Sequence, residues 1–426
     1  MTSLRPPAPR PAKPSVSGVE RLARWLKPRL LAQLERLEGG HITLIEADGE
    51  CRQFGRGGPL AACVTVHRER TWRRLALGGT VGAGEAYMDG DWDSDDLVTL
   101  IRLFAANLER VNGSIENGSA RLARWLSGAW HTLKRNTPRG SRRNVSAHYD
   151  IGNELFELFL DRRHRMYSSA LFPHAEASLE EASTCKLERL LDTLDVGADH
   201  HLLEIGTGWG GLAIHAARTR GCRVTTTTLS AEQYAYVARR IAEEGLEDRI
   251  TLLKQDYRQL EGRFDRLVSV EMVEAVGHQY LGTYLATLDR LLSDDGLAAL
   301  QAITIRDQRF EAAKREVDFI KRHVFPGGFL PSHSAILTGL ARHTTFNLLD
   351  LEEIGPHYAR TLREWRERFE ANLESVRRLG YEERFIRLWR YYLCYCEGGF
   401  LERSIGTCQL LLAKPGARRG PLTGQP

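Results

Sequence analysis

From Ser146 onward, the chain alternates short apolar runs with longer segments in which apolar residues recur every three or four positions. The first pattern is typical of buried strands and the second of amphipathic helices. Because the two alternate, they predict an α/β domain with a doubly wound, Rossmann-like parallel sheet. The predicted strands are His201–Ile205, Arg223–Thr228, Ile250–Leu253, Phe264–Val270 and Leu297–Ile303.

The N-terminal part of the chain has a different pattern. His41–Ile45 and Cys63–Val66 have the character of short strands, and the glycine-rich stretch Gly55–Gly58 separates them. This part predicts a smaller α+β domain. The expected division of the chain is a disordered basic tail (1–18), the α+β domain (19–111), a linker with an amphipathic helix (112–145), the α/β domain (146–413) and a flexible tail (414–426).

Two predicted helices carry the same hexapeptide, RLARWL, at residues 21–26 and 121–126. Both copies place Trp and Leu on one face and Arg on the other. Such helices either pack on their own domain or lie on a membrane surface. The pattern favours packing and leaves the membrane surface open.

Composition excludes several classes of protein. Hydrophobic residues make up 42% and charged residues 27%, and no apolar run reaches the roughly 18 residues of a membrane span. The first eighteen residues lack the apolar stretch of a secretory signal. Seven cysteines without disulfide or metal spacing predict a reducing cytoplasm and no metal site. A net charge of +4 is too small to favour nucleic acid as a partner.

A glycine-rich turn follows the first predicted strand of the α/β domain, in the sequence HLLEIGTGWGG (201–211). Glycines let the backbone turn tightly and approach a ligand without a Cβ in the way. Gly206, Gly208 and Gly211 satisfy the GxGxxG pattern of dinucleotide sites. This turn alone therefore does not separate NAD from S-adenosylmethionine.

Three neighbouring features favour S-adenosylmethionine. Glu204 precedes the turn, where its carboxylate can meet the ammonium and sulfonium end of this ligand. The acid that would hold an NAD ribose about twenty residues later is missing. At that point the sequence has Thr228, Leu229 and, farther on, Gln233, and the next strand ends in Gln255 and Asp256, an oxygen of which can accept from the adenine amino group.

A series of stretches, in order, resembles the cyclopropane fatty acid synthase family, bacterial enzymes related to the mycolic acid cyclopropane synthases. The likeness spans about residues 75–413. The stretches are GEAYMDGDW (84–92), HYDIGNELFELFLD (148–161), MYSSALF (166–172), LEIGTGWGGLA (203–213), TLSAEQ (228–233), QDYR (255–258), VEMVEAVG (270–277), FPGGFLPS (325–332), HYARTLREW (357–365) and YYLCYCEGGF (391–400).

This resemblance implies a lipid-binding first domain and a second domain that binds S-adenosylmethionine, with S-adenosylhomocysteine as product. It implies methyl transfer to a cis double bond of an unsaturated phospholipid, as in a cyclopropane-fatty-acyl-phospholipid synthase. It also implies a bicarbonate ion as the base that deprotonates the resulting carbocation so that a cyclopropane ring closes.

The family's site residues carry over to this chain in part. Glu274, Tyr358 and the backbone of Ile303 match ligands of the bicarbonate ion, and Ser169 and Gln301 stand where the family has cysteine and histidine. Both replacements keep a polar group, so the resemblance still implies a bound oxyanion. The resemblance further implies that Tyr149, Tyr167 and Ser168 border the methionine end of the cofactor.

Two alternatives to ring formation remain open. The changes at Ser169 and Gln301 leave room for C-methylation that gives a methyl or methylene branch without ring closure. A lipid-binding or scaffold protein with a relic cofactor pocket is the alternative from another class. It predicts no methyl transfer, and the intact glycine turn, Gln233, Asp256 and Glu274 argue against it.

The expected substrate places the protein at a membrane. Because the double bond lies inside a leaflet, we expect a cytoplasmic protein in peripheral contact with the inner face of the membrane, through an exposed apolar or basic patch. Phe325 and Phe329 are expected near the mouth of a lipid tunnel. Family likeness also suggests a homodimer.

Overall fold

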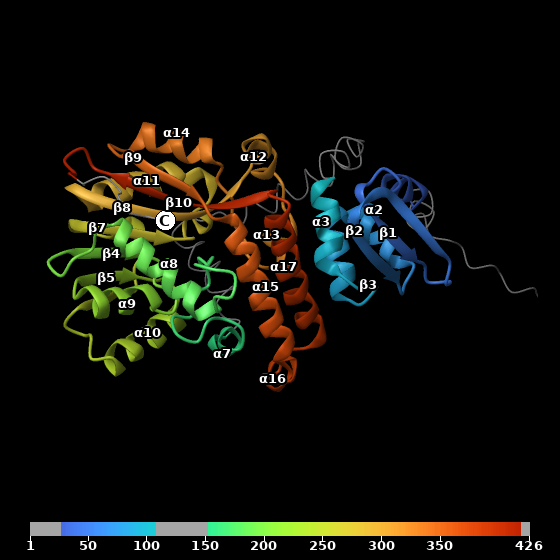
Figure 1. The fold of residues 1–426 in the computed structure, drawn as a ribbon, viewed down its shortest axis with the longest axis horizontal. Coiled ribbons are helices and arrows are strands. Elements are labelled where there is room, and N and C mark those ends of the chain that lie inside the picture. The colour runs from blue at the N-terminus through green and yellow to red at the C-terminus, as the bar shows by residue number, and fades with distance from the viewer. Residues whose placement is uncertain (1–26, 108–151, 419–426) are drawn as a thin grey trace, which may run out of the picture.

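The computed structural model describes residues 27–107 and 152–418. A small N-terminal α+β part and a larger α/β part lie side by side, with α15 (Gly355–Ala371) and α17 (Glu383–Leu401) near the junction (Figure 1). The following predicted features lie outside the described residues: the N-terminal tail (1–18), residues 419–426 of the C-terminal tail (414–426), both RLARWL segments, the linker with its amphipathic helix (112–145) and Tyr149.

A seven-stranded sheet forms the centre of the α/β part. Its strand order is β6-β5-β4-β7-β8-β10-β9; the five strands from β6 to β8 are parallel, and β10 pairs antiparallel with both β8 and β9. The predicted α/β fold is confirmed. The strands are β4 (His201–Ile205), β5 (Arg223–Thr227), β6 (Ile250–Leu253), β7 (Phe264–Val270), β8 (Leu292–Ile305), β9 (Asn347–Glu353) and β10 (Ile405–Ala413).

Helices cover both faces of this sheet (Figure 1). These helices shield the central strands from water. In β4, for example, Leu202 to Ile205 are all buried. The other helices of this part are α7 (Asn153–Glu157), α8 (Leu179–Thr193), α9 (Gly211–Arg220), α10 (Ala231–Glu243), α11 (Leu281–Leu291), α12 (Asp307–Ala313), α13 (Phe319–His323), α14 (His333–His343) and α16 (Leu373–Arg378), with 3-10 turns at Tyr257–Gln259, Val273–Ala275 and His278–Tyr280.

The N-terminal part is an antiparallel sheet in the order β1-β2-β3, packed with two helices. Its elements are β1 (Glu38–Ile45), β2 (Cys51–Val66), α2 (Arg70–Met88), β3 (Trp92–Ser94) and α3 (Leu97–Ala106), and residues 27–34 are helical. The predicted α+β character is confirmed, but the expected break at Gly55–Gly58 is wrong because β2 runs through it. Gly55 and Gly58 have φ of 97° and 88°, and a Cβ there would lie 2.5 and 2.3 Å from the β1 backbone. Glycine here permits an irregular strand rather than ending it.

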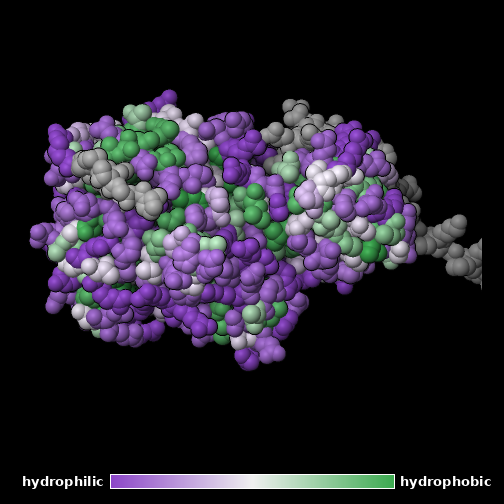
Figure 2. All heavy atoms as spheres, viewed as in Figure 1, coloured by the Kyte–Doolittle hydropathy of each residue, from purple (hydrophilic) through white to green (hydrophobic). Residues whose placement is uncertain are grey.

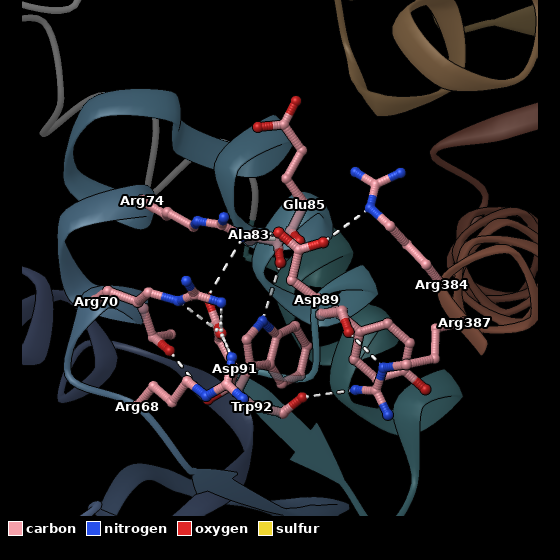
Figure 3. A network of polar contacts seen from close by, with 12 residues as sticks. Arg68, Arg70, Arg74, Ala83, Glu85, Asp89, Asp91, Trp92, Arg384 and Arg387 are labelled. Atoms are coloured by element: carbon pink, nitrogen blue, oxygen red, sulfur yellow. Dashed lines mark hydrogen bonds and ion pairs between the residues drawn. The ribbon is translucent and has the colours of Figure 1, made fainter. Parts of the chain in front are cut away.

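An arginine-rich network joins the N-terminal part to α17 (Figure 3). Asp91 is fully buried and lies 2.7 Å from Arg70, at the turn that leads into β3. From α17, Arg384 pairs with Asp89 at 2.8 Å, and Arg387 donates to the Trp92 carbonyl at 2.9 Å. These contacts fix the N-terminal part against the helix that also supports the site.

None of the helices between residues 27 and 107 or 152 and 418 is long and apolar enough to cross a membrane. All seven cysteines are free.

Candidate active site

Functional side chains meet at the carboxyl ends of the parallel strands, beside the glycine turn after β4. Gly206, Gly208 and Gly210 have φ of 100°, 52° and 81°, a region that side chains with a Cβ disfavour. Thr207 in the turn donates from its backbone N to the Thr227 carbonyl at 3.0 Å, which fixes the turn against β5. A Cβ on Gly208 would have no neighbour within 4 Å, so open space lies in front of the turn.

Glu204 is the last acid before this turn and lies on β4. It is 3% exposed, and its Oε2 accepts from the Thr226 hydroxyl at 2.6 Å. Burial raises the pKa of Glu204 to about 7, although the Thr226 hydrogen bond opposes this shift. A buried carboxyl whose neighbours are threonine hydroxyls fits a cationic ligand group, and contact with the cofactor stays a prediction.

The segment after β5 brings Thr228, Leu229 and Gln233 together. The Thr228 hydroxyl donates to Gln233 Oε1 at 2.8 Å, and Ser230 caps α10 by accepting from the Gln233 backbone N at 3.2 Å. Gln233 Nε2 is buried and has no hydrogen-bond partner among the described residues. An unpaired buried donor is costly, so this amide fits a ligand acceptor.

Gln255 and Asp256 follow β6, as predicted. Asp256 is 2% exposed and pairs with Arg258, with Nη2 to Oδ2 at 2.7 Å. The Gln255 side-chain amide donates to the Gln259 carbonyl at 2.6 Å. Both side chains thus have partners within the chain, and contact with an adenine ring stays a prediction.

Tyr167, Ser168 and Ser169 reach the site on a segment that Asp161 organises. Asp161 accepts from the backbone N of His164 at 2.6 Å and of Met166 at 2.7 Å. Tyr167 Oη lies 2.8 Å from Tyr392 Oη, and the Tyr167 ring stacks on Trp365 with centroids 5.2 Å apart. Tyr149, the remaining residue predicted to border the cofactor, lies outside the described residues.

A buried lysine supports this segment from α8. Lys186 Nζ donates to Ser168 Oγ at 2.7 Å, and the Lys186 side chain is 0% exposed. Burial lowers the pKa of Lys186 to about 8, whereas the nearby carboxylates, of Glu271 above all, raise it. The sequence analysis did not predict this cation in the site.

The centre of the site is Glu271, which directly follows β7. Its Oε1 accepts from the Ser169 backbone N at 2.9 Å and from Gln301 Nε2 at 2.8 Å, and its Oε2 accepts from the Tyr358 hydroxyl at 2.7 Å. Gln301 is in turn held by Gln409, whose Nε2 donates to Gln301 Oε1 at 2.9 Å. The structure brings the predicted residues Ser169, Gln301 and Tyr358 together around Glu271, a carboxylate that the sequence patterns did not mark.

The predicted carboxylate, Glu274, lies one short turn farther along the chain. Its Oε1 accepts from the backbone N of Ile303 at 2.5 Å, and its buried Oε2 has no partner among the described residues. Burial, reinforced by the charge of Glu271, raises the pKa of Glu274 to about 8. This shift favours the protonated form of Glu274 at neutral pH. Burial also raises the pKa of Glu271, but the hydrogen bonds from Ser169, Tyr358 and Gln301 oppose that shift and favour its charged form.

Aromatic rings enclose these carboxyl groups. Tyr358 stacks on Phe400 with centroids 4.5 Å apart, and Phe325 lies 6.4 Å from the ring of Tyr167. Such walls exclude water and present electron-rich faces to a cation. Among the described residues there is no group of three or more His, Cys, Asp or Glu placed to hold a metal ion.

The position expected for Phe329 needs correction. Phe329 is 3% exposed and its backbone N donates to the Glu274 carbonyl at 2.9 Å, so it belongs to the core under the site and to no exposed patch. Exposed apolar side chains lie elsewhere, over α14 and β9 (Figure 2), where Leu337, Leu348 and Leu349 are 39%, 40% and 48% exposed.

Comparison with known proteins decides the family. The profile of the family described as mycolic acid cyclopropane synthetase matches residues 136–410. The chain belongs to this family. It is also 37% identical to the tuberculostearic acid methyltransferase UfaA1 of Mycobacterium tuberculosis over 88% of each chain. It is 34% identical to the cyclopropane-fatty-acyl-phospholipid synthase of Escherichia coli over 84% of this chain and 89% of that protein.

Solved structures agree with this membership. The mycolic acid cyclopropane synthase CmaA1 in complex with S-adenosylhomocysteine superposes with a TM-score of 0.60 at 29% identity, over 64% of this chain and 98% of that one. This member of the family is thus an S-adenosylmethionine-dependent methyltransferase that modifies lipid acyl chains. Glu204, the open glycine turn and Gln233 Nε2, which has no partner within residues 27–107 and 152–418, are groups that fit the cofactor.

The site does not fit the bicarbonate ion that the resemblance implies. Tyr358 and Gln301 donate to Glu271, and Ile303 donates to Glu274. The Ser169 hydroxyl donates to the Ala170 carbonyl at 3.0 Å, so Ser169 contributes its backbone N rather than its side chain. Ser169, Gln301, Tyr358 and the Ile303 backbone N thus already have partners, whereas Glu274 Oε2 has none among the described residues. An added anion would be repelled by the neighbouring Glu271 carboxylate.

Proposed function

We propose that this chain transfers the methyl carbon of S-adenosylmethionine to a cis double bond in an acyl chain of an unsaturated phospholipid. Family membership and the likeness to the phospholipid synthase of Escherichia coli support the proposal. The observation that carries it is the buried cluster around Glu271, held by Ser169, Gln301 and Tyr358 within aromatic walls beside the glycine turn. Such a site can receive an apolar chain and a cation together.

The chemistry needs little covalent help from the protein. S-adenosylmethionine, when bound, supplies an electrophilic methyl carbon. The alkene's π electrons form the new C–C bond as the C–S bond breaks, which leaves S-adenosylhomocysteine and an acyl carbocation. Loss of a proton from the transferred carbon then closes a cyclopropane ring, with net addition of CH2. Tyr167, Tyr358 and Phe325 provide aromatic faces near the cation and keep water away.

A branched product is the second candidate. The 37% identity to a tuberculostearic acid methyltransferase favours it, as do Ser169 and Gln301 at positions where the resembling family has cysteine and histidine. In this outcome a hydride shifts along the acyl chain, and proton loss from a neighbouring carbon leaves a methylene or other olefin. Both outcomes share the first step. They differ in whether the first cation loses a proton directly from the transferred carbon, which closes the ring, or loses a proton only after the hydride shift, which leaves an olefin.

The substrate also bears on where the protein acts. We propose peripheral contact with the inner, cytoplasmic face of the membrane, because the double bond lies inside a leaflet. The N-terminal part is proposed to help capture the lipid, since it packs directly on α17 beside the site.

Labelled methyl transfer tests this function. The purified chain, S-adenosylmethionine with a carbon-13 methyl group and vesicles of a cis-unsaturated phospholipid should give acyl chains heavier by one labelled CH2. NMR then separates the products, because a ring leaves no olefin and shows upfield ring protons. Vesicles of saturated phospholipid serve as the control. A protein that binds S-adenosylhomocysteine yet transfers no label would be a lipid-binding protein with a relic pocket.

A further inference from the structure

We propose that Glu271 is the catalytic base of this enzyme and replaces the anion that the family resemblance implies. The inference rests on the proposed function, since a base is needed only if an acyl carbocation forms. It adds a residue that sequence comparison did not mark and removes bicarbonate from the reaction.

Three donors from three separate elements hold the Glu271 carboxylate. The Ser169 backbone N comes from the segment before α8, Gln301 from β8 and Tyr358 from α15, at distances between 2.7 and 2.9 Å. These same three residues match the expected ligands of bicarbonate. A carboxylate and a bicarbonate ion have the same planar oxygen pair, so the chain's own side chain takes the place of the ion.

Glu271 is less deeply buried, as a whole residue, than its donors. Ser169, Gln301 and Tyr358 are 0%, 1% and 6% exposed, whereas Glu271 has intermediate exposure, as Glu274 does. A group that must take a proton from a ligand has to be within reach of that ligand.

The neighbouring carboxyl, Glu274, is a poorer base. One of its oxygens is fixed to the Ile303 backbone N, and the other is buried. Two adjacent carboxyls do not both ionise readily in an apolar site, and the one with more donors keeps the charge. Glu271 has three donors and the buried cation of Lys186 nearby, whereas only backbone N–H groups, of Ile303 and of Glu274 itself, stabilise the charge of Glu274 among the described residues.

The backbone at Glu271 points to a functional constraint. Glu271 has φ of 50°, which costs a residue with a Cβ about 1–2 kcal/mol, and glycine would adopt it without that cost. Its backbone N donates to the Gln301 carbonyl at 2.7 Å, which holds it there. The following residue, Met272, lies against the glycine turn, with Cγ 3.3 Å from where a Gly206 Cβ would be. Glu271 therefore stands next to the cofactor turn.

In the proposed step, one proton moves from the carbocation to Glu271. The carbocation loses one C–H proton, the electrons of that bond close the ring or form the olefin, and one Glu271 oxygen takes the proton. Glu271 returns this proton to solvent before the next turnover. No oxidant, reductant or added ion takes part.

Two variants and the removal of bicarbonate test the inference. Glu271→Gln keeps the shape and removes the base, so we expect a rate of methyl transfer at least about 100-fold lower. Glu271→Gly removes the carboxylate, relieves the backbone and frees all three donors. We expect it to be equally inactive in CO2-free buffer and to regain activity in proportion to added bicarbonate. The native enzyme should be equally active with and without bicarbonate.

The controls separate the possible failures. The exposed Glu261 can be changed to Gln as a matched loss of charge away from the site, with no expected effect. Binding of S-adenosylhomocysteine, measured by calorimetry, shows whether each variant is folded. Native activity that depends on bicarbonate, or a Glu271→Gln variant with native rate, would overturn the role of Glu271. Native enzyme that transfers no methyl group under any condition would instead overturn the proposed function.

Discussion

Glu274 holds its proton to a higher pH than an exposed glutamate does, and this couples the stability of the protein to pH. Its pKa is raised to about 8, chiefly by burial and then by the charge of Glu271. Between about pH 4.5 and 8 the folded chain keeps a proton that the unfolded chain has lost. The free energy of unfolding should therefore fall as pH rises through this window, by up to about 1.4 kcal/mol per pH unit.

Denaturant unfolding of the native chain and Glu274→Gln from pH 5 to 8 measures this effect. The amide mimics the protonated carboxyl and does not titrate. In the variant, the free energy of unfolding should therefore fall less steeply with pH, by the contribution of about one proton. Glu204→Gln is the matched control: the pKa of Glu204 is raised to about 7, again by burial, so its substitution should flatten the slope only below that pH. Equal slopes for native protein and Glu274→Gln would show that Glu274 is already charged at neutral pH.

At the scale of single residues, the sequence predicted which groups meet but not how they pair. Glu204, Gln233, Ser169, Gln301 and Tyr358 are all buried in the structure, and their roles stay predictions. Glu271 was missed because the motif VEMVEAVG has two acids, and only the second matches the family's ion ligand. Its position directly after the predicted strand Phe264–Val270 could have marked Glu271 as a site residue. Its role depends on donors from distant elements, which spacing along the chain does not reveal.

At the scale of elements, the segment from Asp161 to Ser169 illustrates how one buried acid places several site residues. Asp161 is 1% exposed, and each of its oxygens accepts a backbone N–H, from His164 and from Met166. In Asp161→Asn one of these acceptors becomes an NH2 group that faces an N–H. The loss of this hydrogen bond should lower the free energy of unfolding by about 1–3 kcal/mol.

The same substitution should weaken cofactor binding, because the segment carries Tyr167 and Ser168. We expect a lower midpoint of thermal unfolding together with a several-fold higher Kd for S-adenosylhomocysteine in calorimetry. Asp350→Asn, on the exposed part of β9, is the matched control and should change neither quantity. An unchanged Kd in a destabilised Asp161→Asn would mean that this segment does not contact the cofactor.

Prediction of elements worked best for the parallel strands. β4, β6 and β7 begin and end at the predicted residues because each is a short apolar run bounded by polar or glycine residues. β8 begins five residues earlier than expected, at Leu292, since its polar start still pairs with Phe264 of β7. The strand break predicted at Gly55–Gly58 failed because glycines there allow close approach of β1, a tertiary reason that local composition does not contain.

At the scale of the whole molecule, Arg387 is the most connected link between the N-terminal part and the catalytic part (Figure 3). From α17 it donates to the Tyr87 carbonyl at 2.5 Å, to the Trp92 carbonyl at 2.9 Å and to Asp93 at 2.7 Å. Its guanidinium also lies 4.1 Å from the centre of the Tyr87 ring. The side chain is 12% exposed, so water replaces these contacts poorly.

Arg387→Ala should consequently loosen the N-terminal part while leaving the cofactor site intact. We expect a lower denaturant midpoint, faster proteolysis of the N-terminal part and slower methyl transfer to phospholipid vesicles, with an unchanged Kd for S-adenosylhomocysteine. Arg384→Ala is the matched control from the same helix. Arg384 has one ion pair, to Asp89, and is 56% exposed, so its loss should cost at most about 1 kcal/mol. If Arg387→Ala separates the two parts and methyl transfer to vesicles continues at the native rate, the N-terminal part takes no part in lipid capture.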